Sequence, residues 1–158
     1  MEKNFSHLDS KDHPQMVDVG QKDESVRFAK ARSIVQLPIE VAQLFQDKEI
    51  QTKKGPVFQT AILAGIMAVK KTSELIPLCH PLPITKCNVE INMQDDNHVV
   101  IDCIVKMKGR TGVEMEALTG ASIAALTIYD MCKGFSHDIV IEQVQLMEKT
   151  GGKRDFKR

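Results

Sequence analysis

The sequence predicts an α+β domain of the ferredoxin-like type, βαββαβ, with one extra helix. Residues 86–93 and 98–108 alternate apolar and polar side chains, which indicates an antiparallel hairpin. Residues 57–74 and 115–133 instead carry apolar side chains at helical spacing. With a strand before the first of these helices and a strand after the second, the order is that of the split βαβ motif. We therefore expect an antiparallel sheet with helices covering one face.

The first part of the chain is expected to hold an arm, a strand and the extra helix. Residues 1–15 are polar and predict a flexible arm, so that a single domain covers residues 16–150. Residues 25–37 mix apolar and basic side chains and predict the first strand. Pro38 suits the first position of a helix. We expect this extra helix to end near Asp47.

The long helix of residues 57–74 is followed by a stiff loop. Lys70 lies in the last turns of the helix, where a lysine usually complements the helix dipole. Prolines at three positions between 77 and 83 then exclude a regular element. His80 precedes Pro81, which favours an extended backbone at the histidine. A histidine in a rigid loop is a candidate functional residue, although a lone histidine is more often structural.

Both faces of the predicted hairpin are apolar. Val99 and Ile101 belong to one face, and Val100 and Ile104 to the other. Helices cover only one face of such a sheet, so the second face needs another cover, and the obvious cover is another subunit. We therefore expect a homo-oligomer.

The helix of residues 115–133 organises the rest of the chain. It follows a glycine-flanked turn at residues 109–112, and Gly134 lies where a C-cap glycine belongs. Small residues at its centre allow another element to approach closely. A last strand is predicted at residues 139–147, followed by a mobile basic tail at residues 151–158.

Three charged side chains of this helix are candidates for chemistry. Glu116 lies in the first turn, where a carboxylate suits the helix dipole, whereas Asp130 lies near the unfavourable C-terminal end. Lys133 is its neighbour on the same face, and a solvated ion pair is the commoner explanation for such a pair. Glu116 and Asp130 are separated by roughly 21 Å along a straight helix. Either only one of them belongs to a site, or the site is shared between subunits.

Composition excludes several classes of protein. A net charge of zero argues against a broad nucleic-acid surface. No segment is long and apolar enough to span a membrane, and the polar N-terminus is unlike a signal peptide, so we expect a cytoplasmic protein without a membrane partner. The four cysteines lack C-x-x-C spacing and are interpreted as reduced, mostly buried thiols. No metal site is expected.

Motifs for nucleotide binding and hydrolysis are absent, including the P-loop, the dinucleotide-binding glycine pattern and the nucleophile elbow. Phosphates, if they bind, must then be held by scattered basic residues: Lys22, Arg27, Lys54, Lys70, Lys71, Lys86, Lys108 and Arg110. Together with His80, Asp130 and Lys133, such a set would suit acid–base chemistry on a polyphosphate.

Five blocks of the sequence resemble the molybdenum cofactor biosynthesis protein C family, whose members are cyclic pyranopterin monophosphate synthases. The blocks occur in the family's order and span nearly the whole chain: residues 16–19, 75–82, 111–119, 124–133 and 151–153. The resemblance implies a lyase that converts 3′,8-cyclo-7,8-dihydro-GTP to cyclic pyranopterin monophosphate and pyrophosphate. The substrate would come from a radical S-adenosylmethionine GTP cyclase.

The resemblance also implies an assembly and a set of site residues. The family is a ferredoxin-like homohexamer, a trimer of dimers, with sites at subunit interfaces. No cofactor is implied, and whether Mg²⁺ accompanies the triphosphate stays open. Asp130 and Lys133 match the catalytic pair. The substrate-binding positions correspond to Leu78, Cys79, His80, Met115, Glu116, Lys54 and Lys70, with Lys22 and Arg27 on the triphosphate.

Two other functions stay under consideration. A ferredoxin-like nucleic-acid module would need aromatic side chains on its sheet for base stacking. The hairpin strands have none, and the whole chain has no Trp and one Tyr. A regulatory domain would bind a nucleotide at a subunit interface without chemistry, and it predicts binding of GTP analogues without pyrophosphate release.

Overall fold

The computed structural model describes residues 7–158, and at its centre is a five-stranded sheet in the order β5-β6-β1-β7-β8. Every neighbouring pair is antiparallel. The four long strands have the order of the ferredoxin-like fold, which confirms the predicted α+β class. The strands are β1 (Ser25–Gln36), β5 (Lys86–Met93), β6 (His98–Gly109), β7 (Val140–Thr150) and β8 (Phe156–Lys157).

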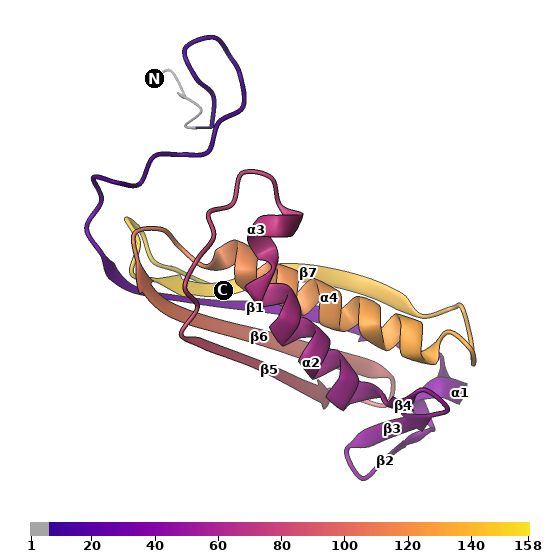
Figure 1. The fold of residues 1–158 in the computed structure, drawn as a ribbon. Coiled ribbons are helices and arrows are strands. Elements are labelled where there is room, and N and C mark those ends of the chain that lie inside the picture. The colour runs from indigo at the N-terminus through magenta and orange to yellow at the C-terminus, as the bar shows by residue number, and fades with distance from the viewer. Residues whose placement is uncertain (1–6) are drawn as a thin grey trace.

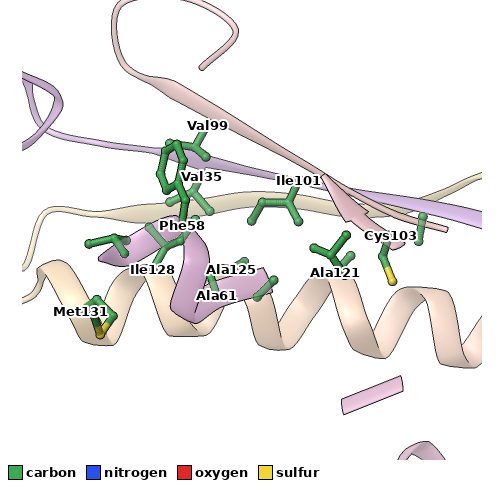
Figure 2. Packing of buried hydrophobic residues seen from close by; sticks show 14 of the residues in the cluster. Val35, Phe58, Ala61, Val99, Ile101, Cys103, Ala121, Ala125, Ile128 and Met131 are labelled. Atoms are coloured by element: carbon green, nitrogen blue, oxygen red, sulfur yellow. The ribbon is translucent and has the colours of Figure 1, made fainter. Parts of the chain in front are cut away.

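Helices α2 (Val57–Lys70) and α4 (Glu114–Cys132) cover one face of this sheet, and the single turn α3 (Thr72–Leu75) follows α2 (Figure 1). Alternate residues of β1 and β6 point to the helices and are buried, as the hairpin pattern predicted. Figure 2 shows Val35 and Ile101 from the sheet meeting Ala125 and Ile128 of α4. None of the helices in residues 7–158 is long and apolar enough to cross a membrane.

Two glycines allow α2, α4 and the sheet to approach closely. A Cβ on Gly65 would lie 3.1 Å from the carbonyl oxygen of Gly120. A Cβ on Gly120 would lie 2.6 Å from Sγ of Cys103 on β6. The small residues at the centre of α4 therefore set how near the helices lie to each other and to the sheet.

The extra helix is much shorter than predicted. It is one turn, α1 (Ile39–Ala42), and the expectation that it runs to Asp47 is wrong. The chain instead forms a small sheet, β2-β3-β4, from Phe45–Gln46, Glu49–Thr52 and Gly55–Pro56. Asp47 and Lys48 have φ values of 51° and 65°, as a two-residue hairpin turn requires.

Two predicted helix ends also differ from the structure. Residue 133 caps α4 in the right-handed conformation, and Gly134 is not left-handed, so the expected glycine C-cap is wrong. The helix of residues 57–74 ends at Lys70, where the Thr72 hydroxyl donates to the carbonyl oxygens of Ala68 and Val69. The chain then makes the separate turn α3.

The two ends of the chain carry local structure within the described residues. Leu8 and Pro14 form an isolated antiparallel bridge inside the predicted arm, whose flexibility stays a prediction. The basic tail contains β8, which pairs with β7. Its last residue donates a backbone hydrogen bond to the carbonyl of Met147. All four cysteines are free; Cys103 and Cys132 are buried, and the other two are partly exposed.

The second face of the sheet is not covered by any helix of residues 7–158 (Figure 1). Val26 and Val140 lie on this face and are exposed. The face is less apolar than predicted, because Asp102 lies at its centre and accepts hydrogen bonds from Arg32 at 2.7 and 2.8 Å. Lys30 pairs with the same carboxylate at 2.9 Å. A second subunit on this face remains a prediction.

Candidate active site at the two ends of α4

A first group of candidate residues surrounds the start of α4. A cavity of about 420 Å³, which we call the loop cavity, lies between this helix end, the proline-rich loop and the segment before β1. Leu78, Cys79 and His80 reach it from the loop, and Met115 and Glu116 from the helix. Its full lining is His7, Val17, Val19, Lys22, Leu78, Cys79, His80, Leu82, Thr111, Gly112, Glu114, Met115 and Glu116.

Glu116 is the most perturbed acid of this cavity. Only 4% of the residue is exposed. Burial and, to a smaller extent, the charge of Glu114 raise the pKa of its carboxyl to about 7, although a backbone hydrogen bond lowers it in part. The carboxyl therefore exchanges a proton near neutral pH, which is the property that general acid–base catalysis requires.

His80 connects the loop to the N-terminal segment. Its Nε2 donates a hydrogen bond to the carbonyl oxygen of Val17 at 2.7 Å. A carbonyl can only accept, so Nε2 carries the proton and Nδ1 is left to contact a ligand. Burial raises the pKa of the neighbouring Cys79 thiol, and the charge of Glu116 raises it further.

A second cavity of about 500 Å³ adjoins the loop cavity and is strongly basic. We call it the basic cavity; its cationic lining comprises Lys22, Arg27, Arg110, Lys149, Lys153 and Arg154. The Arg27 side chain donates to the backbone oxygens of Gly109 and Arg110, both at 3.2 Å, which orients its guanidinium group. The lining has the chemistry of a site for an anion with several charges.

Tight backbone turns shape this basic cavity. Gly151 has a φ of +85°, and a Cβ there would overlap the carbonyl oxygen of Val26. The hydroxyl of Ser25 donates to the carbonyl of Gly151 at 2.6 Å. These contacts bring Lys153 and Arg154 back towards β1. The sequence reasoning missed Lys149 and these two residues as ligand candidates, although the Gly-Gly-Lys block was a usable signal.

The catalytic candidates gather at the other end of α4. The carboxylate of Asp130 lies 2.8 Å from Nζ of Lys133 and 3.0 Å from Nζ of Lys54. Lys54 comes from the β3–β4 turn and also donates to the backbone oxygen of Asp130 at 2.9 Å. Thr52, Met131 and Phe135 help to line a small cavity of about 280 Å³ beside them.

Mutual hydrogen bonds set the charges of this group. Those from Lys133 and Lys54 hold the pKa of Asp130 below its usual value. The hydrogen bond to Asp130 raises the pKa of Lys133. At neutral pH the pair is therefore a carboxylate and an ammonium group, and both side chains are about half exposed.

The structure brings the candidates together in two groups rather than one. Glu116 lies at the first turn of α4 and Asp130 at the last, so the two groups are at opposite ends of one helix (Figure 1). Lys70 lines none of the three cavities. In residues 7–158, no three His, Cys, Asp or Glu side chains are grouped to hold a metal ion.

Comparisons with known proteins match almost all of the chain. A model of the MoaC family matches residues 16–152. A molybdenum cofactor biosynthesis bifunctional protein of Synechocystis is 53% identical over 155 residues, which cover 96% of this chain and 45% of that protein. Molybdenum cofactor biosynthesis protein 1 of Dictyostelium discoideum is 52% identical over 167 residues, which cover 94% of this chain and 26% of that protein.

A third relative has nearly the length of this chain. The cyclic pyranopterin monophosphate synthase of Xanthomonas campestris is 51% identical over 152 residues, and the match covers 96% of this chain and 92% of that protein. The chain thus spans less than half of the first two relatives and most of the third.

Proposed function

The chain belongs to the MoaC family, and from this membership we propose that it is a cyclic pyranopterin monophosphate synthase of molybdenum cofactor biosynthesis. The observation that carries the proposal is the match over residues 16–152, which includes every site residue predicted from the sequence. The enzyme is a lyase: it converts 3′,8-cyclo-7,8-dihydro-GTP to cyclic pyranopterin monophosphate and releases pyrophosphate. A radical S-adenosylmethionine GTP cyclase supplies the substrate, and the protein acts in the cytoplasm.

The active site is shared between subunits of a homohexamer, a trimer of dimers. Two features support this assembly. The two groups of candidates lie at opposite ends of α4, so one small substrate cannot contact both within a chain. A sheet face with exposed Val26 and Val140 is also left without a cover among the described elements. In such a dimer, the loop cavity of one subunit faces Asp130 of the other.

The charges of Asp130 and Lys133 at neutral pH assign their acid–base roles. Asp130 starts as the carboxylate and is the general base, while Lys133 starts as the ammonium group and is the general acid. Lys54 holds the carboxylate in place. The proton transfers serve the opening of the substrate's ring and the closure of the pterin. Glu116 and His80 supply further proton-transfer groups at the opposite side of the substrate.

The basic cavity receives the triphosphate. Lys22 and Arg27 neutralise its charge and favour the departure of pyrophosphate after attack on the α-phosphate. The reaction needs no redox cofactor, since the substrate and product have the same oxidation level. Mg²⁺ bound to the triphosphate is compatible with this arrangement, because the ion would be brought by the substrate.

Pyrophosphate release tests the proposal. Purified protein is mixed with freshly prepared 3′,8-cyclo-7,8-dihydro-GTP, and Asp130→Ala and Asp138→Ala variants are run alongside. Asp138 is exposed near the same helix end and is the matched control. We expect release by the wild type and by Asp138→Ala, and none by Asp130→Ala with an unchanged oligomer. Release by all three proteins would support the synthase activity but contradict the catalytic role of Asp130.

The same experiment separates the regulatory alternative. A folded wild-type oligomer that binds GTP analogues but releases no pyrophosphate would contradict the synthase proposal. Nucleic-acid binding is not supported, because the centre of the exposed sheet face carries the ion pairs of Lys30 and Arg32 with Asp102, and the hairpin strands β5 and β6 hold no Phe, Tyr or Trp side chain for base stacking.

A further inference from the structure

We propose that Glu114 is a positioning residue that couples the two adjoining cavities: a polyphosphate that draws Lys149 away from Glu114 leaves a free carboxylate beside Glu116 and so favours the protonated form of Glu116. The identity of the natural ligand rests on the proposed function. The coupling itself is a property of the cavities and is testable with inorganic tripolyphosphate.

Glu114 stands at the boundary between the cavities. It lines both of them, together with Lys22, Thr111 and Gly112. Its Oε1 accepts a hydrogen bond from Nζ of Lys149 at 2.8 Å. The two side chains are 27% and 33% exposed, so the pair is reachable from solvent and by a ligand.

Lys149 belongs to the basic cavity and has a competing partner there once a polyphosphate binds. Five other cationic side chains line the same cavity, and they concentrate anionic ligands at this place. A phosphate oxygen accepts a charge-assisted hydrogen bond from an ammonium group as strongly as a carboxylate does. A ligand with several negative charges therefore competes with a single carboxylate for Lys149.

Gly112, two residues before Glu114, leaves room for this arrangement. A Cβ on Gly112 would overlap the carboxylate oxygens of Glu114. Any residue other than glycine at position 112 would therefore displace this carboxylate. Gly112 does not have a positive φ, so an alanine is acceptable to the backbone. The substitution Gly112→Ala therefore moves the Glu114 carboxylate without removing its charge.

The ionisation of Glu116 responds to the loss of the pairing between Glu114 and Lys149. The carboxyl of Glu116 is buried, and the nearby charge of Glu114 opposes its ionisation. While Lys149 is paired with Glu114, the ammonium group cancels part of that charge. The other titratable groups lining the cavity are Lys22 and His7 from the N-terminal segment and Cys79 and His80 from the loop.

Coupling of this kind would make protonated Glu116 available as an acid mainly when a polyphosphate occupies the basic cavity. Glu116 titrates near neutral pH, so a modest change in the local charge converts a half-protonated carboxyl into a mostly protonated one. The proton comes from solvent when the ligand binds. Glu116 can then donate it to a substrate group in the loop cavity while the phosphates occupy the basic cavity.

The test follows the titration of Glu116 by NMR in the full chain, labelled with carbon-13 at the glutamate carboxyls. The Glu116→Gln variant identifies the resonance. In the wild type, saturation with tripolyphosphate should raise the titration midpoint of Glu116 by about one pH unit, the size expected for a charge a few ångströms away. Glu74→Gln, an exposed glutamate outside the cavities, should behave as the wild type does.

Two variants separate the coupling from the direct field of the ligand. In Glu114→Gln, tripolyphosphate should bind, but the rise should fall to less than a third. In Gly112→Ala, the rise should also shrink, although every charge is kept. An equal rise in the wild type and Glu114→Gln, an unmoved midpoint in the saturated wild type, or no binding of tripolyphosphate would each overturn the inference. Failure of the proposed function would appear separately, as absent pyrophosphate release with a normal titration shift.

Discussion

Replacement of Glu116 by glutamine should stabilise the protein above neutral pH and leave it almost unchanged in acid. The pKa of this buried carboxyl is raised from 4.5 to about 7. A carboxyl whose pKa is raised by folding contributes stability that is complete below pH 4.5 and is lost as the pH rises to 7. The reason is that this carboxyl ionises at a lower pH in the unfolded chain than in the folded protein. The difference in pKa corresponds to about 3 kcal/mol. The neutral glutamine avoids this loss.

Urea unfolding at pH 4.5 and pH 8, at a fixed protein concentration, measures the effect. The free energy of unfolding of Glu116→Gln should exceed that of the wild type by about 2–3 kcal/mol at pH 8 and by less than about 1 kcal/mol at pH 4.5. Glu74→Gln serves as the control, since its side chain is exposed. A variant less stable than the wild type at pH 8, or a difference that does not depend on pH, would refute the reasoning.

Three further substitutions test the packing and the charges described above. Gly120→Ala should lower the free energy of unfolding by about 1–2 kcal/mol in urea, because overpacking outweighs the gain in helix propensity; an unchanged value would mean that the neighbouring side chains yield freely. Gly151→Ala should weaken tripolyphosphate binding at least tenfold in calorimetry, because its φ of +85° and its contact with Val26 shape the basic cavity; full affinity would contradict that role. Lys54→Met should raise the pKa of Asp130, as followed by carboxyl NMR, because one of its two hydrogen-bonding cations is lost; an unmoved pKa would show that Lys133 alone sets it.

The main sheet was predictable because its side chains alternate strictly. The residues of β6 that were expected on one face, such as Val99 and Ile101, are those that are buried. The first strand of the small sheet, β2, was missed because Phe45 also fits the apolar side of the predicted extra helix. Phe45 packs on Phe58 at a centroid distance of 5.7 Å, and this contact is formed only when α2 is in place.

The candidate residues could be found from the sequence blocks, but their grouping could not. The blocks place Lys54 and Asp130 far apart in the chain, and the β3–β4 turn brings them within 3.0 Å. Glu114 was not among the candidate residues predicted from the sequence. Its pairing with Lys149 depends on β7 returning beside the start of α4, which no local pattern encodes.

The sequence by itself determined the ferredoxin-like order of elements, the family and the two ends of α4 as places for chemistry, because side-chain periodicity and contiguous blocks are local properties of the chain. The tertiary structure decided which charges meet. Burial raised the pKa of Glu116, and strand pairing placed Lys149 beside Glu114. Both effects depend on solvent exclusion and on distances between residues remote in sequence, and these exist only in the folded protein.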